Sequence, residues 1–470
     1  MLESLRLVNF KSWKDTGDIQ LAPITAFFGT NSSGKTSLLQ ALLLLKQTVA
    51  SNNEFVTLDY GQLDALFVEL GSFKEIIFNH DENLPLEFNL EWKLPKELSI
   101  NLIQNDVSKN LKGNKLIFTA KIKKNNGDSA KVETLKYIIG NSEIGLKREK
   151  DSYKINTKPT ITALNFNDLT ENFDLYIYPV KFYGLGLQNG ISFPSSYYHV
   201  QNNIFNPLSF QIESLFRKIY YLGPLRAHPR KNYGWTNDTQ SQEVGNRGER
   251  TIETILTLDN QNRYAIEEEN NHLLLSQTVA YWLKRLGLIE DFTIKNDSYG
   301  SSNYRVYIKI SKESPEVLLT EVGFGISQII PVITLCYSVP KGSIVIIEQP
   351  ELHLHPKVQS ELADVFIHAI KTRGIQIILE SHSEHLLRRL QRRMAEFGLN
   401  DSSVDKEKIN LYFCKSQDGA SVIEKLVLDE FGNISNYPEN FFGDDFGEIA
   451  AMAKARIARI QKSKQTENSI

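Results

Sequence analysis

Hydrophobic residues alternate with polar ones along the first thirty residues of the chain. The segments 2–10 and 19–28 follow this period of two, and the polar residues 14–18 lie between them. The pattern predicts two strands joined by a turn. From Gly34 the chain changes to a Leu- and Ala-rich run over 35–49 without Gly or Pro, which predicts a helix. We therefore expect the order strand, glycine-rich turn, helix.

The middle of the chain has a different pattern. Short β-like stretches divided by Asn, Asp and Gly clusters extend from about 55 to 219 and predict a mainly antiparallel insertion. The elements predicted after it are helices over 251–258 and 272–286 and a strand over 303–310. Two later runs, 343–347 and 375–379, are continuous, apolar and β-branched, as in buried parallel strands. Alternation of strands and helices of the nucleotide-binding type therefore occurs at both ends of the chain and is interrupted by the insertion.

Composition narrows the class of protein. The chain has 470 residues, of which 41% are hydrophobic and 23% charged, values typical of a globular protein with several domains. The net charge of -3 predicts no general attraction to nucleic acid or anionic membranes. Two cysteines, Cys336 and Cys414, are too few for a disulfide framework or a four-cysteine zinc site. With no signal-peptide pattern and no apolar run of membrane-spanning length, we expect a soluble, cytoplasmic protein.

The glycine-rich turn at 29–36 reads Gly-Thr-Asn-Ser-Ser-Gly-Lys-Thr and matches the phosphate-binding pattern G-x-x-x-x-G-K-[ST]. It lies between a predicted strand and a predicted helix, which is the context that this motif requires. Backbone N–H groups would surround the phosphates, Lys35 would reach the β and γ phosphates, and Thr36 would hold Mg²⁺. The residues predicted here to bind the nucleotide are Gly29, Asn31, Ser32, Ser33, Gly34, Lys35, Thr36 and Ser37.

The apolar run 343–347 ends in a carboxylate, Glu348. Ligands of open α/β sheets bind at the carboxyl ends of the strands, so Glu348 is predicted to hold the Mg²⁺ shell. Either Gln349 or Glu351 would face the attacking water. A buried strand that simply ends in a solvated loop is the alternative, which the neighbouring phosphate motif disfavours.

The second apolar run, 375–379, ends in a polar cluster that contains His382. An imidazole donates or accepts a hydrogen bond near neutral pH, so His382 is predicted to contact a γ-phosphate or the hydrolytic water. A structural role for His382 is the alternative. A zinc site formed with His353, His355 and His385 is disfavoured, because His353 and His355 alternate with leucines instead of following helical metal-pair spacing.

The segment 322–328 contains two glycines and a serine before an apolar helical run that extends through Leu335. Pro331 is expected in the first turn of that helix, where proline is tolerated. The segment predicts either a second phosphate-binding helix N-terminus or a plain capping turn.

In this order, the motifs resemble the SMC/RecF-like branch of the ABC ATPases, and especially compact bacterial ATPases related to the OLD family. The matching segments are 5–12 (first strand), 29–36 (Walker A), 323–328 (degenerate signature), 348–356 (Walker B and D-loop) and 380–383 (H-switch). The resemblance covers about 1–75 and 315–430, and the middle third carries no matching motif.

The resemblance implies an α/β fold, an ABC-type P-loop NTPase head with a mixed sheet and flanking helices. A β-rich and then helical insertion would separate Walker A from the signature and Walker B. The domains expected are 1–75 (N-terminal lobe of the head), 76–315 (insertion, for dimerisation or partner binding), 316–430 (C-terminal lobe) and 431–470 (C-terminal extension with a basic helix).

The resemblance also implies ATP and Mg²⁺ as cofactors. It adds Lys11 to the nucleotide site, and it places Gly325, Ser327 and Gln328 on the ATP bound to another protomer. The catalytic residues implied are Glu348, Gln349, Glu351 and His382, and the metal ligands are Thr36 and Glu348. ABC ATPases usually have glutamate where this chain has Gln349, so we expect slow hydrolysis or a substitute role for Glu351. Gln62 is a candidate Q-loop residue by position only.

Such relatives include the ATPase subunits of the Septu and PARIS anti-phage systems, and the tail 436–442 resembles their C-terminal extension. The implied function is a nucleotide-gated oligomeric switch or scaffold that controls a separate effector in anti-phage defence. No Toprim nuclease pattern follows His382, so the effector is expected to be a nuclease in trans. The partners implied are another copy of the chain through the ATPase heads, that nuclease and a phage protein as trigger, with no membrane.

Two alternatives stay open: a RecF-like repair ATPase that binds DNA directly, and an ATP sensor with little hydrolysis. The basic clusters available for DNA are Arg226, His228, Arg230 and Lys231; Arg388, Arg389, Arg392 and Arg393; and Lys454, Arg456, Arg459, Lys462 and Lys464. The balanced overall charge favours solvated faces or partner contacts for these clusters over a DNA groove.

Overall fold

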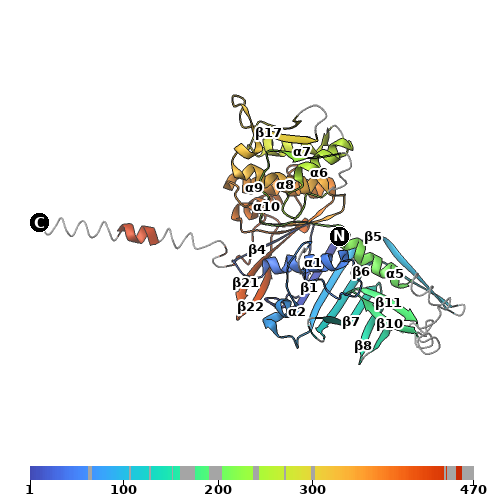
Figure 1. The fold of residues 1–470 in the computed structure, drawn as a ribbon. Coiled ribbons are helices and arrows are strands. Elements are labelled where there is room, and N and C mark those ends of the chain that lie inside the picture. The colour runs from blue at the N-terminus through green and yellow to red at the C-terminus, as the bar shows by residue number, and fades with distance from the viewer. Residues whose placement is uncertain are drawn as a thin grey trace, which may run out of the picture.

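Two large sheets contain most of the strands of the structure, a computed structural model (Figure 1). The residues described are 1–61, 66–104, 107–125, 127, 129–150, 152–158, 175–189, 204–236, 243–268, 271–297, 302–438, 441 and 451–457. Gln62, Arg459, Lys462 and Lys464 lie outside these residues, as does most of the predicted C-terminal extension.

A six-stranded mixed sheet contains both runs that were predicted as buried parallel strands. Its order is β12-β19-β20-β4-β21-β22, in which neighbouring strands are parallel except for the last pair. The strands are β4 (Ile24–Gly29), β12 (Ile219–Leu222), β19 (Ile344–Glu348), β20 (Gln376–Glu380), β21 (Ile409–Gln417) and β22 (Ala420–Lys425). The predicted mixed sheet is therefore confirmed, and β20 lies between β19 and β4 although it follows both in the sequence.

Helices cover both faces of this sheet. They are α1 (Lys35–Ala50), α6 (Thr251–Asn260), α7 (Leu275–Arg285), α8 (Phe324–Ser338), α9 (Pro356–Arg373) and α10 (Glu384–Ala395). In Figure 1, α1 lies below the sheet and α8, α9 and α10 lie above it. On β19, Ile344 and Ile346 belong to the core that contains α1, whereas Val345 and Ile347 belong to the core that contains α6 to α10. Burial on both faces explains why these strands are apolar throughout.

The second sheet is antiparallel and continues from the first strand of the chain into the insertion. Its order is β2-β1-β5-β6-β7-β8-β9, and β3 pairs with β1. The strands are β1 (Leu2–Phe10), β2 (Trp13–Asp15), β3 (Ile19–Gln20), β5 (Leu86–Gln104), β6 (Val107–Lys124), β7 (Ala130–Ile139), β8 (Ser142–Glu149) and β9 (Ser152–Lys158). The boundary predicted at residue 75 stays a prediction, and β1 before it pairs directly with β5 after it.

The predicted strand over 19–28 is two strands in two different sheets. β3 pairs with β1 in the antiparallel sheet, whereas β4 pairs with β20 and β21 in the mixed sheet. Pro23 lies between them and has no N–H for a ladder hydrogen bond, so the chain changes sheets there. The prediction of one continuous strand over 19–28 was therefore wrong.

Two helix starts also differ from the prediction. Residues 272–274 belong to strand β15, and α7 begins at Leu275, where Asp259 Oδ1 accepts a hydrogen bond from the Leu275 N–H at 2.9 Å. Helix α8 begins at Phe324, so the glycine segment forms its first turn and Pro331 lies in its interior. The expectation that Pro331 occupies the first turn was wrong because the helix begins earlier than predicted.

The remaining elements are smaller. They are α2 (Phe73–Ile76), η1 (Phe78–His80), β10 (Leu175–Val180), β11 (Gly184–Asn189), α5 (Asn206–Arg217), β13 (Tyr233–Gly234), β14 (Tyr264–Glu268), β15 (Asn271–Leu274), β16 (Asp291–Asn296), β17 (Asn303–Lys309), β18 (Glu316–Leu318), η3 (Leu319–Glu321) and η4 (Lys406–Lys408). Residues 451–457 are also helical. Within the described ranges, every helix is too short or too polar to cross a membrane.

Candidate functional site

The glycine-rich loop between β4 and α1 opens onto a cavity of about 250 Å³. Its lining residues are Ser12, Asn31, Ser32, Ser33, Gly34, Lys35, Thr36, Ser37, Gln349, Glu380 and His382. Three distant chain segments meet here, because the carboxyl ends of the parallel strands β4, β19 and β20 lie at one edge of the sheet. The structure thus brings the predicted Gln349 and His382 to the predicted loop.

Two glycines allow the loop to run close to neighbouring strands. A β-carbon on Gly29, at φ 140°, would lie 2.0 Å from the carbonyl oxygen of Cys414 on β21. One on Gly34, at φ 89°, would lie 2.5 Å from Ser421 Oγ and 2.8 Å from Ser12 Oγ. Both positions therefore require glycine for space as well as for positive φ.

The Lys35 amine is directed back onto the loop. Its Nζ donates hydrogen bonds to Thr30 O at 2.7 Å, to Gly29 O at 3.1 Å and to Ser33 Oγ at 3.4 Å. Burial lowers the pKa of Lys35, and the carboxylate of Glu380 opposes that shift. Phosphate oxygens in the cavity would be stronger acceptors for this amine than the loop carbonyls.

The Thr36 hydroxyl donates a hydrogen bond to Glu380 Oε2 at 2.8 Å. Glu380 is the last residue of β20 and is 3% exposed. Burial raises the pKa of Glu380, while the hydrogen bond from Thr36 and the charge of Lys35 act in the opposite direction. Sequence reasoning missed Glu380, although it ends an apolar strand in the same way as Glu348.

Glu348 does not line the cavity. Its Oε1 accepts a hydrogen bond from the Tyr221 hydroxyl at 2.8 Å, and its backbone oxygen accepts one from Arg226 Nη2 at 3.0 Å. Burial raises the pKa of Glu348 to about 7; the bond from Tyr221 opposes this shift, and the charge of Glu380 adds to it. Thr36 is thus hydrogen-bonded to Glu380, whereas Glu348 Oε1 is hydrogen-bonded to Tyr221. The predicted joint binding of a metal by Thr36 and Glu348 stays a prediction.

Of the other predicted catalytic residues, Gln349 and His382 line the cavity and Glu351 does not. Gln349 lines the cavity in a left-handed backbone conformation, φ 44°, and its N–H donates to Glu380 O at 2.9 Å. Glu351 is 7% exposed and lies outside the lining, with Oε1 accepting the His382 N–H at 2.7 Å. The His382 ring lines the cavity, and burial together with Lys35 lowers its pKa, which favours neutral imidazole.

Lys11 is close to the loop but does not line the cavity. Its Nζ donates to Gln40 Oε1 on α1 at 2.6 Å, and its backbone is left-handed with φ 52°. The next residue, Ser12, lines the cavity in its place. The predicted nucleotide contact by Lys11 stays a prediction.

The predicted signature residues lie at the start of α8, outside the cavity. Ser327 and Gln328 are 7% and 4% exposed, and Ser327 Oγ donates to Phe324 O at 2.7 Å. The Phe324 ring contacts the rings of His228 and His353, with centroids 5.5 Å and 5.0 Å away. Phe324 is 39% exposed, so its side chain, unlike those of Ser327 and Gln328, is accessible to another molecule.

The donor set at the loop fits a nucleotide phosphate chain with a divalent cation. The loop precedes the N-terminus of a 16-residue helix, where unpaired N–H groups and the helix dipole attract anions. Lys35 supplies a cation, and Thr36 with Glu380 supplies oxygen atoms of the type that Mg²⁺ prefers. Among the described residues, no group of three or more His, Cys, Asp and Glu side chains is arranged to hold a metal ion.

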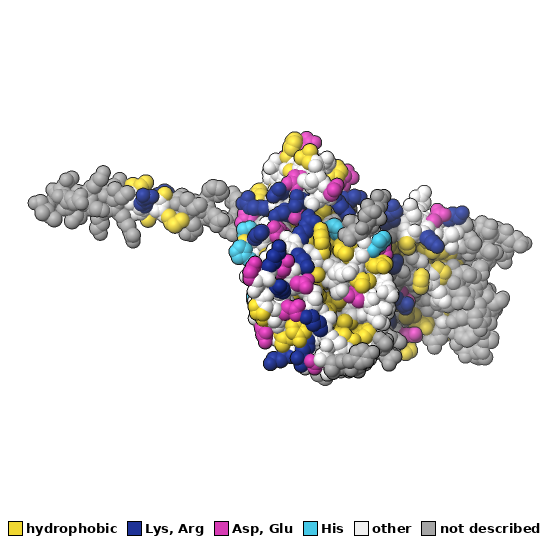
Figure 2. Space-filling view, turned by 90° about the horizontal axis from the view of Figure 1, so that it is seen from above, with side chains coloured by type: hydrophobic (Ala, Val, Ile, Leu, Met, Phe, Trp, Pro, Cys, Tyr) yellow, Lys and Arg dark blue, Asp and Glu magenta, His cyan; other side chains and the backbone are white. Residues whose placement is uncertain are grey.

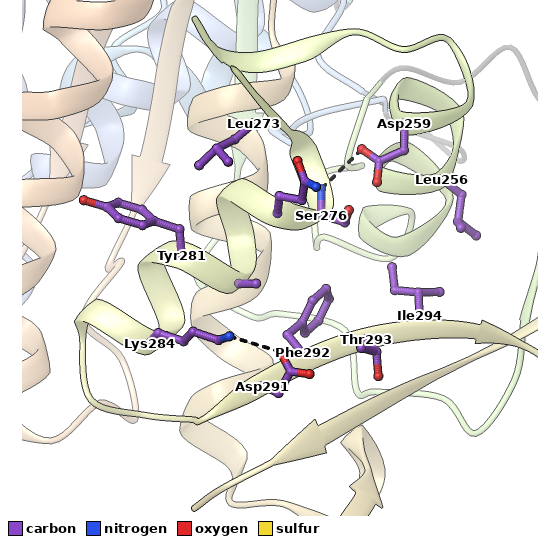
Figure 3. A pocket seen from close by; sticks show the side chains of 12 residues that line it. Leu256, Asp259, Leu273, Ser276, Tyr281, Lys284, Asp291, Phe292, Thr293 and Ile294 are labelled. Atoms are coloured by element: carbon purple, nitrogen blue, oxygen red, sulfur yellow. Dashed lines mark hydrogen bonds and ion pairs between the residues drawn. The ribbon is translucent and has the colours of Figure 1, made fainter. Parts of the chain in front are cut away.

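A larger cavity of about 610 Å³ lies between α6, α7 and β16, away from the glycine-rich loop (Figure 3). Its lining includes the apolar residues Leu256 and Phe292 and an ion pair between Lys284 and Asp291, 3.1 Å apart. Asp259 Oδ1 accepts hydrogen bonds from the backbone N–H groups of Leu275 and Ser276 at the start of α7. Because this cavity contains none of the phosphate-binding residues, we place the candidate site at the loop.

Family models match nearly the whole chain. A model described as an AAA ATPase domain matches residues 1–387. A model described as a protein of unknown function (DUF3696) matches residues 404–452. A search of curated proteins gave no match.

Solved structures with a similar fold include three SMC head domains. The SmcHead bound to the C-winged helix domain of ScpA is 11% identical, with 91% of this chain and 98% of that chain covered and a TM-score of 0.44. The SMC head domain from Thermotoga maritima is 12% identical, with 91% and 99% covered and a TM-score of 0.39. The Smc head domain with an extended coiled coil, bound to the C-terminal domain of ScpA derived from Pyrococcus furiosus, is 10% identical, with 91% and 96% covered and a TM-score of 0.40.

Proposed function

Because the chain belongs to the family of AAA ATPase domains, we propose that it binds ATP with Mg²⁺ at the glycine-rich loop and hydrolyses it slowly. The observation that carries this proposal is the composition of the cavity. Loop residues before α1 share it with Gln349 and His382, which follow two other strands of the same sheet. The cavity therefore combines a site for the phosphates with two polar side chains that can contact a water molecule.

Each residue of the cavity has a role in this proposal. The loop N–H groups and Lys35 bind the phosphates, and Thr36 holds Mg²⁺. The bound cation neutralises charge that develops on the transferred phosphoryl group. The neutral His382 imidazole hydrogen-bonds the γ-phosphate or the water, which its lowered pKa favours.

The proposal of slow hydrolysis rests on Gln349. Its amide can orient a water molecule but cannot accept a proton from it. The substitute considered for this role, Glu351, is held by the His382 N–H and does not line the cavity. This position supports Gln349 as the residue that orients the water, and it disfavours Glu351 as a general base.

We further propose that nucleotide binding closes two ATPase heads on each other and thereby switches an effector. The N-terminus of α8 would contact the ATP of the second protomer through the backbone at Gly323 and Gly325, since the Ser327 and Gln328 side chains are buried. Gly325 leaves little space for a side chain, because a β-carbon there would lie 3.0 Å from His353 O.

Arg226 supports a switch with two arrangements. It is 6% exposed, and Nη2 donates to the Glu348 carbonyl, while Nε and Nη1 have no partner among the described residues. Glu351 Oε2 also has no partner there, and its charge acts on Arg226. A buried charge without full pairing is costly, so a closed arrangement that pairs these groups would gain stability.

The effector and the biological setting are proposals from the resemblance to OLD-related ATPases. In this view the effector is a nuclease on a separate chain, the trigger is a phage protein, and the system acts in anti-phage defence in the cytoplasm. The C-terminal region, which matches a family of unknown function, is a candidate contact for such a partner.

Light scattering coupled to size exclusion tests the switch. With ATP and Mg²⁺, the wild-type chain should change from a smaller to a larger assembly, and Lys35→Ala should not. Lys14→Ala, which removes an exposed lysine outside the cavity, is the matched control and should behave as wild type. Assembly that is the same with and without nucleotide would contradict the switch.

A RecF-like DNA-binding ATPase is the second candidate. The α10 arginines do not favour it, because Arg388 and Arg392 pair with Glu384 and Glu396, and Arg389 and Arg393 pair with Asp364. On the face seen in Figure 2, Lys and Arg side chains are interspersed with Asp and Glu side chains. Salt-sensitive DNA binding by the purified chain would favour this candidate.

The third candidate is an ATP sensor that scarcely hydrolyses, and it rests on Gln349. Turnover that rises in Gln349→Glu while nucleotide affinity is unchanged would favour a sensor. Rapid turnover by the wild type would exclude it.

A further inference from the structure

The order of strands in the mixed sheet determines which carboxylate is nearest to the glycine-rich loop. β20 lies between β19 and β4, and Glu380 at its end is the register partner of Glu348 on one side and of Phe27 on the other. The loop begins two residues after Phe27. Glu380 is therefore one strand closer to the loop than Glu348, since neighbouring strands are about 4.8 Å apart.

The contacts of the three nearby carboxylates agree with this order. Glu380 lines the cavity and accepts the Thr36 hydroxyl hydrogen at 2.8 Å. Glu348 accepts the Tyr221 hydroxyl hydrogen, and Glu351 accepts the His382 N–H. Of the three, Glu380 alone is among the residues that line the cavity.

The separation of the Thr36 and Glu380 oxygens suits a shared cation. Mg²⁺ binds oxygen ligands at 2.0–2.1 Å in an octahedron, so two adjacent ligands are about 3 Å apart. The distance between Thr36 Oγ1 and Glu380 Oε2 is 2.8 Å. A hydroxyl that donates its hydrogen to a carboxylate still offers a lone pair to a metal and is oriented by that bond.

We infer that Glu380, and not Glu348, is the acidic residue that completes the divalent-cation site with Thr36. This inference rests on the proposed ATPase function and assigns a residue to it that the sequence motifs did not. Glu348 then has a positioning role: its carboxylate accepts a hydrogen bond from Tyr221 and its backbone oxygen accepts one from Arg226. His382 Nε2 lies 4.0 Å from Glu380 Oε1, so the imidazole is next to this carboxylate.

The direct test is Mn²⁺ binding, followed by electron paramagnetic resonance, to the full chain loaded with a non-hydrolysable ATP analogue. Glu380→Gln keeps the shape of the side chain and a hydrogen-bond acceptor for Thr36 but removes the charge. We expect it to weaken Mn²⁺ binding by about tenfold or more. Glu348→Gln is the matched comparison and should weaken it by less than about threefold, since only an indirect effect remains.

The outcomes separate the inference from the proposed function. A loss of Mn²⁺ affinity in Glu348→Gln that equals or exceeds the loss in Glu380→Gln would overturn the inference. If wild type binds no nucleotide analogue even without metal, the proposed function itself fails. Should Glu380→Gln not fold, Glu380→Asp keeps the charge but shortens the side chain by one methylene, and wild-type Mn²⁺ affinity in that variant would also overturn the inference.

Discussion

At the scale of single residues, the glycine-rich loop packs tightly against neighbouring strands and also supplies polar atoms to the candidate site. Gly29 and Gly34 bring the loop against β21 and β22, and Lys35 and Thr36 direct polar atoms to the cavity. These residues were readable from the sequence because the motif is local. Glu380 was not, because its importance depends on the position of β20 between β19 and β4, which no local pattern encodes.

Lys11 illustrates the same limit. The resemblance implied that Lys11 contacts the nucleotide, which stays a prediction, but the sequence could not show that its amine donates to Gln40 and that Ser12 lines the cavity. The resemblance also implied nucleotide contacts for Gly325 and Ser327, but the sequence could not show that the Ser327 side chain is buried and bonded to Phe324 O.

Gly29→Ala should destabilise the fold by about 3 kcal/mol, because the new methyl group would lie within 2.0 Å of a backbone oxygen. Urea unfolding followed by circular dichroism measures the change. Gly234→Ala is the matched control, since nothing lies within 4 Å of its β-carbon, and it should be nearly neutral. Equal stability of the two variants would show that β21 does not pack against the loop in this way.

At the scale of elements, α10 is fixed to α9 by one buried carboxylate. Asp364 on α9 is 8% exposed and accepts hydrogen bonds from Arg393 at 2.7 and 2.8 Å and from Arg389 at 3.0 Å. The arginine cluster on α10 was predicted from sequence as a solvated face or partner contact. Half of it instead forms a buried connection between the helices that follow β19 and β20.

Asp364→Asn should lower the free energy of unfolding by about 3 kcal/mol or more, because it removes the buried charge that faces both Arg389 and Arg393, and Glu396 pairs with Arg393 only. Glu384→Gln is the comparison, since its pair with Arg388 is exposed, and it should cost less than about 0.5 kcal/mol. The midpoints of urea unfolding measure both losses of stability. Similar midpoints for the two variants would contradict the buried connection between α9 and α10.

The end of α10 predicts a dependence of stability on pH. Partial burial opposes ionisation of Glu396, but hydrogen bonds from Arg392, Arg393 and Asn400 outweigh it and lower its pKa to about 2. A depressed carboxyl pKa stabilises the fold above the unfolded value of 4.5, and this contribution is lost as pH falls from there towards 2.

Glu396→Gln should therefore be less stable than wild type at pH 7, and the difference should shrink below about pH 4.5. Unfolding midpoints in urea, compared at pH 7, 5, 4 and 3, measure this. A difference that stays constant over the whole range would mean that Glu396 contributes shape or packing but not charge.

At the scale of the whole molecule, the mixed sheet separates two hydrophobic cores. One contains α1 and the antiparallel sheet, and the other contains α6 to α10. The predicted fold class, an ABC-type P-loop ATPase head, is confirmed by the matching AAA ATPase domain and by the sheet topology. The sequence could not reveal that the insertion extends the sheet of β1, because pairing of β1 with β5 joins segments about eighty residues apart.

The two cysteines report on the two cores separately. Cys414 belongs to the core with α1 and Cys336 to the other, and both are fully buried. Burial raises the pKa of the Cys336 thiol to about 12 and that of Cys414 further, so little reactive thiolate exists near neutral pH.

Neither thiol should react with an aromatic disulfide reagent in the native chain at pH 8, and both should react after unfolding in urea. The variants Cys336→Ala and Cys414→Ala each leave one thiol, so the urea concentration at which each core opens can be followed by absorbance. Rapid labelling of either single thiol without urea would show that this cysteine is not buried in its core.

The central claim, that the glycine-rich loop is the site of an ATPase, is tested most directly by single-turnover ATP hydrolysis with bound nucleotide quantified. We predict that wild type and Lys14→Ala bind about one ATP per chain and convert it slowly to ADP. Lys35→Ala should retain neither nucleotide nor turnover, because it removes the cation that lines the cavity. Nucleotide binding and turnover in Lys35→Ala that equal those of wild type would contradict the account.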